Sequence, residues 1–149
     1  VIKSNEDRSA ILHKRVNLIL KNKIKNKKIA FLGVTFKANT DDMRDSNSLI
    51  MIPYLSKKGA RIKYYDPTGE KKEFKKIKNV EYAFSVNQAC MNADLIVLHT
   101  EWDEFKAIEF NTLKTKKTCK VYDLRNLFDY KEMKKKKIKY YSVGRPNLN

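Results

Sequence analysis

The residues best suited to ligand chemistry lie together in one polar segment, residues 35–46. Two cations of this segment, Lys37 and Arg44, flank the neighbouring carboxylates Asp41 and Asp42. Lysine and arginine bind phosphate through charge-assisted hydrogen bonds, and a carboxylate beside an arginine can hold its guanidinium in a fixed direction. The same residue types also cap and solvate ordinary surface loops. The segment therefore predicts either an anion-binding loop or a plain polar turn.

A third cation is expected to lie near this polar segment in the folded protein. Arg125 directly follows the strand predicted to end with Val121-Tyr122-Asp123-Leu124, and the apolar residues 29–34 lie just before the polar segment. Both runs have the pattern of strands buried in a sheet. Ligands of open α/β sheets bind where the carboxyl ends of parallel strands meet. Arg125 is therefore predicted to lie on the same rim as Lys37, which favours the anion-binding interpretation.

These positions depend on strands and helices that alternate along the chain. The residue patterns predict strands at residues 29–34, 61–67, 95–99, 119–124 and 138–143, and helices at residues 46–58, 85–92, 101–108 and 129–137. Ser46 or Asp45 can cap the first of these helices, and Pro53 predicts a kink or a late start. The alternation indicates an α/β fold with an open, mostly parallel sheet and helices on both faces. An N-terminal helical arm at residues 6–20 and a linker at residues 21–28 are expected to precede it.

Scarce residue types exclude several kinds of site. The four glycines are too far apart for a G-x-G-x-x-G turn or a Walker loop. The two cysteines and two histidines do not stand at metal-ligand spacing, so no metal site is expected. Two unpaired cysteines fit a reducing compartment. No apolar run approaches the about 18 residues of a membrane helix, and we expect a soluble, cytoplasmic protein without membrane contact.

The charge balance is strongly basic. The sequence has 33 basic and 17 acidic residues, a net charge of +16, and six arginines leave 27 lysines among the basic residues. Proteins that recognise bases or bind phosphates use arginine more than lysine, because a guanidinium can donate to two acceptors at once. Lysines on solvated surfaces are the simpler interpretation, and a small basic α/β module that binds nucleic acid is the alternative. A non-catalytic interaction domain is a third possibility.

Six sequence motifs resemble one enzyme family. They are Gly33-Val34-Thr35-Phe36-Lys37, Thr40-Asp41-Asp42-Met43-Arg44-Asp45-Ser46, Tyr65-Asp66-Pro67, Thr100-Glu101-Trp102-Asp103-Glu104-Phe105, Tyr122-Asp123-Leu124-Arg125-Asn126 and Ser142-Val143-Gly144-Arg145. In this order they are similar to the C-terminal domain of the UDP-glucose 6-dehydrogenase (UDP-glucose/GDP-mannose dehydrogenase) family. The resemblance implies a Rossmann-like UDP-binding domain at residues 28–149. It also implies that residues 1–27 are the end of a central-domain helix and a linker, since Asn5-Glu6-Asp7-Arg8 resembles the end of that helix.

The resemblance also implies a function. Members of the family oxidise the C6 alcohol of a UDP-sugar to a carboxylate in two NAD-dependent steps, and the intact enzyme is expected to form a homo-oligomer. By motif position, Phe36, Lys37 and Arg125 would bind the UDP-sugar, and Arg44 would reach toward NAD. Thr40 leans toward the UDP-glucose type, although dehydrogenases of UDP-N-acetylated hexosamines and of GDP-mannose share much of the pattern.

Other features of the family do not occur in this sequence. Its glycine-rich NAD domain and its catalytic cysteine motif have no counterpart, because Cys90 and Cys119 lie in a predicted helix and strand. We therefore expect a C-terminal fragment with no catalytic residue of its own and no dehydrogenase activity alone. His99 ends a strand at the ligand edge without an evident partner, and Trp102 and Phe105 are expected to pack in the core rather than to stack on a base.

Overall fold

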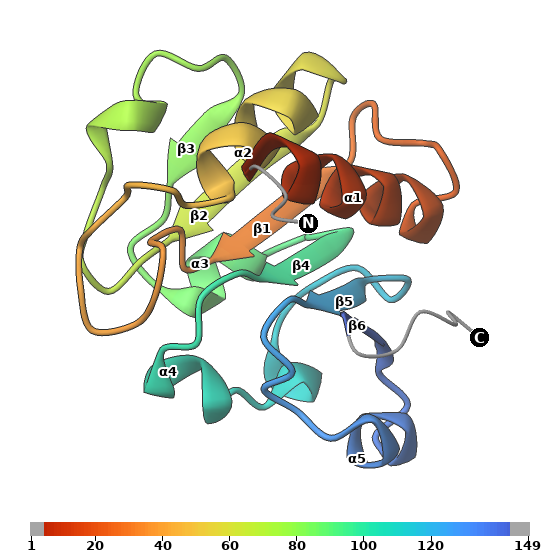
Figure 1. Cartoon of the computed structure of the whole chain (residues 1–149). Coiled ribbons are helices and arrows are strands. Elements are labelled where there is room, and N and C mark those ends of the chain that lie inside the picture. The colour runs from red at the N-terminus through yellow and green to blue at the C-terminus, as the bar shows by residue number, and fades with distance from the viewer. Residues whose placement is uncertain (1–4, 144–149) are drawn as a thin grey trace.

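Six short parallel strands form one sheet in the computed structural model, which describes residues 5–143 (Figure 1). The strand order is β3-β2-β1-β4-β5-β6. The strands are β1 (Lys28–Leu32), β2 (Arg61–Tyr65), β3 (Val80–Tyr82), β4 (Leu95–Leu98), β5 (Lys120–Asp123) and β6 (Lys139–Ser142). Because every neighbouring pair is parallel, all carboxyl ends meet at one edge of the sheet.

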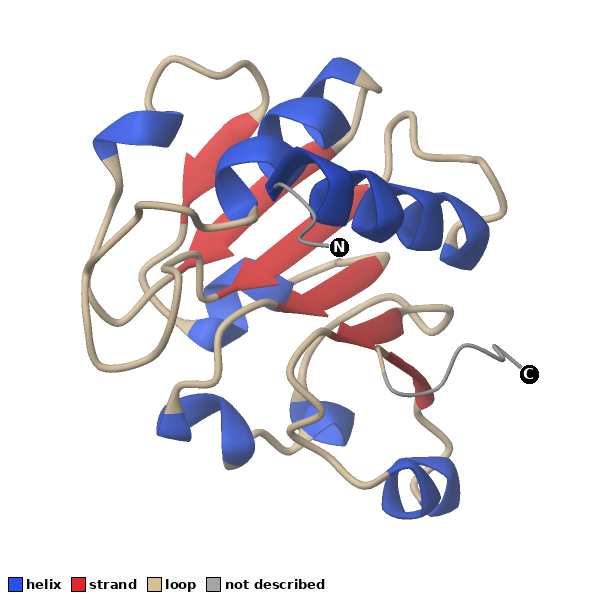
Figure 2. Ribbon diagram, in the orientation of Figure 1, coloured by secondary structure: helices blue, strands red, loops and turns tan. Residues whose placement is uncertain are grey.

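Helices cover both faces of this sheet (Figure 2). The α-helices are α1 (Asn5–Ile19), α2 (Ser48–Lys57), α3 (Val86–Cys90), α4 (Asp103–Lys106) and α5 (Tyr130–Lys135), and two 3-10 turns are η1 (Lys72–Phe74) and η2 (Phe110–Thr112). Helices α1 and α2 lie over one face, and α3, α4 and α5 contribute buried residues to the other. The expected α/β architecture with two covered faces is confirmed.

The central strand β1 shows why the sequence adopts this arrangement. Its apolar residues alternate between the two faces, so that Ile29 and Phe31 pack under α1 and α2 while Ala30 and Leu32 pack toward α3 and α4. All four are almost fully buried. A strand covered on both sides needs a continuous apolar run, which is the pattern that predicted it.

The expected helices and strands occur with their ends within two residues of the predicted positions. Strand β3 was missed, because it is a three-residue edge strand whose side chains are only partly covered. Helix α2 begins at Ser48 with Asn47 at the N-cap position, and the Ser46 hydroxyl oxygen accepts from the N–H of Ser48 at 3.2 Å. The hydroxyls of Ser46 and Ser48 also donate to the carbonyl oxygen of Val34, both at 2.6 Å, which ties the polar loop to the end of β1. Pro53 lies inside α2.

Helix α1 is part of the packed structure. Val16 and Ile19 are buried against the sheet together with residues of α2, and Ile24 in the predicted linker is buried as well. Within residues 5–143, no helix has the length and apolar character needed to cross a membrane. Gly144 and Arg145, which complete the last sequence motif, lie outside the described residues.

Candidate functional site at the carboxyl edge of the sheet

A pocket of about 380 Å³ opens at the carboxyl ends of β4 and β5. We call it the Arg125 pocket. Its lining residues come from five separate parts of the chain and comprise Arg8, Ile11, Leu12, Phe36, Asp45, Asn47, His99, Leu124, Arg125 and Val143. Two arginines, an exposed aromatic ring and the residues before α2 therefore share one cavity. This combination suits a ligand that carries both negative charge and an apolar ring.

Arg125 is held in place by three oxygen acceptors. Its Nε donates to the carbonyl oxygen of His99 at 2.9 Å, and Nη2 donates to the carbonyl oxygen of Phe36 at 2.8 Å. Nη1 lies 3.3 Å from Oε2 of Glu101. A guanidinium has five N–H groups, so two remain on the terminal nitrogens after these contacts. The guanidinium of Arg125 is thus fixed in direction and still has two N–H groups that can donate to an anion.

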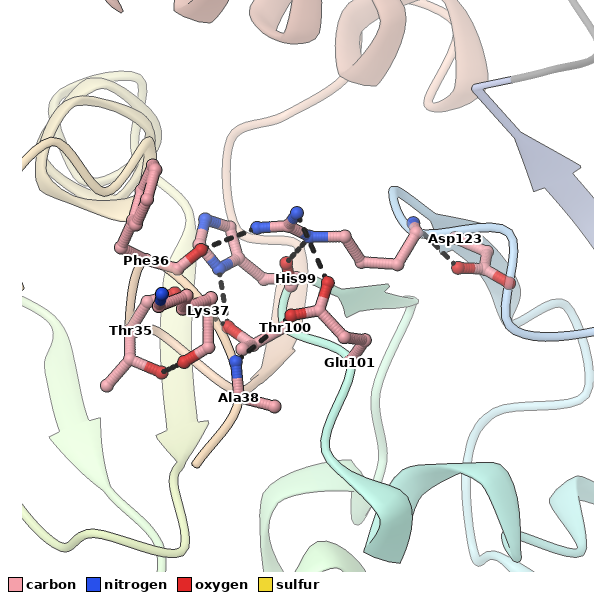
Figure 3. A network of polar contacts seen from close by, with 9 residues as sticks. Thr35, Phe36, Lys37, Ala38, His99, Thr100, Glu101 and Asp123 are labelled. Atoms are coloured by element: carbon pink, nitrogen blue, oxygen red, sulfur yellow. Dashed lines mark hydrogen bonds and ion pairs between the residues drawn. The ribbon is translucent and has the colours of Figure 1, made fainter. Parts of the chain in front are cut away.

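Glu101 joins Arg125 to the loop that follows β1 (Figure 3). Its Oε1 accepts a hydrogen bond from the backbone N–H of Ala38 at 3.0 Å, while Oε2 pairs with Arg125. The carboxylate therefore sets the spacing between the arginine and the Phe36–Ala38 segment. The sequence analysis placed Glu101 in a family motif and at the start of a helix without a binding role, and its position directly after a strand end was the signal for this role.

A buried carboxylate organises the turn that carries Arg125. Oδ1 of Asp123 accepts from the N–H of Arg125 at 3.0 Å, and Oδ2 accepts from the N–H of Leu127 at 2.7 Å and from the hydroxyl of Tyr140 at 2.6 Å. Burial, followed by the hydrogen bond to Asp123, raises the pKa of Tyr140 above its usual range. The Asp123 side chain thus holds the loop after β5 against β6.

We expect the Asp123→Asn variant to lose about 2 kcal/mol of the free energy of unfolding, because its amide would turn an N–H toward buried donors. Urea unfolding followed by circular dichroism measures this loss. Asp129→Asn is the matched control, since Asp129 caps α5 by accepting from the N–H of Glu132, and asparagine caps helices equally well. Equal losses in the two variants would contradict the role given to Asp123.

The loop after β1 places Phe36 in the Arg125 pocket and Lys37 outside it. Phe36 lines the Arg125 pocket with 44% of its surface exposed. Its N–H donates to the carbonyl oxygen of Asp42 at 3.0 Å, which closes the loop. Lys37 is exposed on the same loop, and the hydroxyl of Thr35 donates to its carbonyl oxygen (Figure 3). Lys37 is not among the residues that line the pocket.

Arg44 lies apart from the Arg125 pocket. Its Nε and Nη2 donate to the two carboxylate oxygens of Asp42, each at 3.1 Å, and its side chain is 89% exposed. This contact lowers the pKa of Asp42. Arg44 borders a different cavity of about 600 Å³ together with Glu70 and Lys71. Of the two neighbouring carboxylates, Asp42 makes these paired hydrogen bonds with Arg44.

His99 acts through its backbone. Its ring is buried and lies 3.0 Å from the hydroxyl of Thr100, measured from Nδ1. Burial, with a smaller effect from Arg125, lowers the pKa of His99 to about 3, so the imidazole is neutral near pH 7. Its carbonyl oxygen accepts from Arg125, as described above. Phe105 is fully buried, and Trp102 packs against the same core cluster, as expected.

The lowered pKa of His99 has a consequence for acid stability. An unfolded histidine takes up a proton near its reference pKa of 6.5, whereas folded His99 resists protonation until about pH 3. The folded state is therefore favoured above pH 6.5 and loses stability as the pH falls below it, at up to about 1.4 kcal/mol per pH unit. Urea unfolding between pH 7 and pH 4 should give a shallower pH slope for His99→Gln than for the parent. Identical slopes would contradict this expectation.

Residues missed by sequence reasoning complete the pocket. Arg8 on α1 and Asn47 at the start of α2 both line it. Neither position has a sequence signal for this role, because α1 reaches the pocket only through its packing against α2 and the sheet. Among residues 5–143 there is no group of three histidine, cysteine or acidic side chains that could hold a metal ion.

Comparison with known proteins places these residues in a family. A family model described as the UDP binding domain of the UDP-glucose/GDP-mannose dehydrogenase family matches residues 30–130. UDP-glucose 6-dehydrogenase of Rhizobium meliloti (strain 1021) is 40% identical over 144 residues, which are 96% of this chain and 33% of that protein. The enzyme of the same name from Rickettsia felis (strain ATCC VR-1525 / URRWXCal2) is 40% identical over 147 residues, or 97% of this chain and 33% of its own length. The chain thus spans about a third of these curated relatives.

Solved structures show the same fold. NDP-N-acetyl-D-galactosaminuronic acid dehydrogenase from Methanosarcina mazei Go1 matches with a TM-score of 0.75 and 23% identity, over 93% of this chain and 29% of that one. A UDP-glucose dehydrogenase from Pyrobaculum islandicum matches with a TM-score of 0.72 and 21% identity, over 92% and 29%. The matched family region contains Phe36, Lys37, Arg44 and Arg125. The chain belongs to the UDP-glucose/GDP-mannose dehydrogenase family and corresponds to its UDP binding domain.

Proposed function

We propose that this chain binds the UDP part of a UDP-sugar for an NAD-dependent UDP-glucose 6-dehydrogenase, which converts UDP-glucose to UDP-glucuronate in two oxidation steps. The observation that carries the proposal is the fixed guanidinium of Arg125 in a pocket shared with Arg8 and Phe36. The names of the relatives that are 40% identical support the choice of sugar. Residues 28–149 would form this domain, and residues 1–27 would join it to the central domain.

Each proposed ligand contact has a physical basis. The two remaining N–H groups of Arg125 and the charge of Arg8 suit a pyrophosphate. The exposed ring of Phe36 offers an apolar wall for a ribose or a base. Lys37 follows Phe36 on the same loop but does not line the pocket. Its long side chain would therefore reach the ligand from the rim of the pocket.

Arg44 is proposed to contact NAD across a domain interface. Asp42 engages two of its nitrogens, so both N–H groups of Nη1 and one of Nη2 remain for an outside acceptor. The residues present fit a single contact of this kind. They do not fit the main NAD site, because a dinucleotide-binding turn needs several closely spaced glycines and the turn after β1 has one, Gly33. NAD would accept the hydride, and this chain would only position the two ligands.

The cysteines of this chain do not suit covalent catalysis. Cys90 is fully buried, and desolvation raises its pKa beyond the usual range. Burial also raises the pKa of Cys119 to about 11. A catalytic cysteine must form its thiolate readily, and both thiols here are held protonated. We propose that the catalytic cysteine, the NAD domain and the contacts of a homo-oligomer belong to the intact enzyme beyond this third of its length.

Calorimetric titration of UDP tests the proposed function. The chain should bind UDP with a stoichiometry of one, and Lys37→Ala should bind it more weakly because one rim cation is lost. Lys135→Ala on α5 is the matched control, since it removes the same charge far from the carboxyl edge. Equal affinities in these two variants would contradict the assignment of Lys37. NADH formation from UDP-glucose and NAD by this chain alone would contradict the assignment of catalysis to other domains.

Glu101 supplies a further prediction for the same titration. Glu101→Gln keeps an oxygen for the N–H of Ala38 but loses the ion pair with Arg125, and we expect UDP affinity to fall about three- to tenfold. Glu101→Ala loses both contacts and should bind more weakly still. Glu104→Gln is the control, because Glu104 contacts Tyr65 instead of Arg125. Unchanged affinity in Glu101→Ala would show that Arg125 needs no carboxylate partner.

A further inference from the structure

A second cavity lies at the opposite edge of the sheet. It has a volume of about 230 Å³ and is bordered by the loop after α1 and by the amino ends of β5 and β6, toward the right of Figure 1. Its charged lining comprises five lysines, Lys21, Lys23, Lys27, Lys120 and Lys139, and one carboxylate, Asp94. We call it the lysine pocket. Since β5 carries Lys120 at its start and Asp123 at its end, the strand separates this cavity from the Arg125 pocket.

The lysines are brought together by the fold and not by their spacing in the sequence. Lys120 and Lys139 are direct neighbours in the register of β5 and β6. Like charges at paired positions of adjacent strands repel each other. Lys21 and Lys27 approach from a loop that backbone hydrogen bonds keep compact, including Lys27 N–H to the carbonyl oxygen of Ile24 at 3.0 Å. The protein therefore maintains a repulsive arrangement on an ordered scaffold.

Lys120 lies within reach of several of these charges. Burial lowers the pKa of Lys120, and the charges of Lys21, Lys139 and Lys27 lower it further. Nζ of Lys120 donates to the carbonyl oxygen of Ile19 at the end of α1. That contact gives the ammonium group of Lys120 a hydrogen-bond acceptor, but it involves none of the other lysines that line the pocket.

Asp94 does not neutralise the pocket. Its Oδ2 accepts from the backbone N–H of Lys28 at 2.9 Å and from Nζ of Lys116 at 3.0 Å, and Lys116 is not part of the lining. The single carboxylate is therefore already engaged by other groups. Four net positive charges remain among the six charged lining residues.

We propose that the lysine pocket binds a small anion of the pyrophosphate type, held by ammonium groups from the loop after α1, β5 and β6. Several lysines around a small cavity suit a compact anion with many oxygen atoms. Nucleic-acid-binding surfaces also use aromatic side chains that stack on bases, or arginines that bind two acceptors at once. The lining of this pocket has no aromatic residue and no arginine. This site is independent of the proposed UDP function, because it lies at the other end of the strands.

Calorimetric titration with sodium pyrophosphate at low ionic strength tests this proposal, first with UDP at saturating concentration and then without it. The chain should bind one pyrophosphate in the presence of UDP. The double variant Lys21→Gln/Lys139→Gln should bind it at least about tenfold more weakly, because two ammonium contacts are lost. Lys134→Gln/Lys135→Gln removes the same net charge from exposed positions on α5 and should change the affinity less than about twofold.

Three results would overturn the proposal. Equal weakening in both double variants would show a response to net charge alone. Complete loss of pyrophosphate binding when UDP is added would place the anion in the Arg125 pocket. Tighter binding of a thymidine oligonucleotide than of pyrophosphate, sensitive to Lys21 and Lys139, would identify a nucleic-acid surface instead. Thermal unfolding without anion checks the fold, and we expect Lys21→Gln/Lys139→Gln to be at least as stable as the parent because repulsion is relieved.

Discussion

Replacing Arg125 with alanine is expected to weaken UDP binding by at least about a hundredfold, because two charge-assisted hydrogen bonds to the ligand would be lost. The structure restricts the direction of the Arg125 side chain in the pocket. Three protein oxygens hold its guanidinium, so little ordering remains to be done when the ligand binds. Isothermal titration of UDP into the parent and the variant measures the change.

Two further variants separate charge from geometry. Arg125→Lys retains the positive charge but cannot reach three acceptors and a phosphate at once, and we expect about tenfold weaker binding. Arg44→Ala should leave UDP affinity within about twofold of the parent, because Arg44 borders a different cavity. If Arg125→Ala bound UDP as well as Arg44→Ala does, the pocket would not be the UDP site.

Gly33→Ala is expected to cost at least about 3 kcal/mol of the free energy of unfolding, from an unfavourable backbone conformation together with a steric clash. Gly33 has a φ of +80°, and an added Cβ would lie 2.5 Å from Cβ of Thr100 and 2.8 Å from its Oγ1. The Thr100 hydroxyl donates to the carbonyl oxygen of Thr35 at 2.9 Å, so it cannot simply rotate away without loss. Urea unfolding of the variant measures the cost.

The chain offers a matched control for this substitution. Gly69 has a φ of +96°, but an added Cβ there would have no atom within 4 Å. Gly69→Ala should therefore cost only about 1 kcal/mol, from the backbone conformation alone. The difference between the two variants isolates the contact between β1 and the end of β4. Equal costs would show that the close approach of Gly33 to Thr100 contributes nothing.

The sequence by itself determined the order of most of the elements and predicted the edge of the sheet at which a ligand is expected to bind. Residues 29–34 and 95–98 are apolar throughout, because strands covered on both faces exclude polar side chains. Lys37 and Arg125 could be placed on one rim, since each comes shortly after the end of a predicted strand. The assignment of these two residues and of Arg44 to particular ligands came from motif resemblance and stays a prediction.

The tertiary structure decided which residues contact each other at both edges. The hydrogen bond between Arg125 and Phe36 joins positions 89 residues apart, and the bond from Lys120 to Ile19 joins positions 101 apart. Such pairs depend on strand register and helix packing, which local patterns do not encode. The positions of Arg8 and of the lysine pocket had no sequence signal for this reason, and Glu101 had only its place after a strand end. At each edge, the side chains come together only when six parallel strands bring distant segments of the chain into contact.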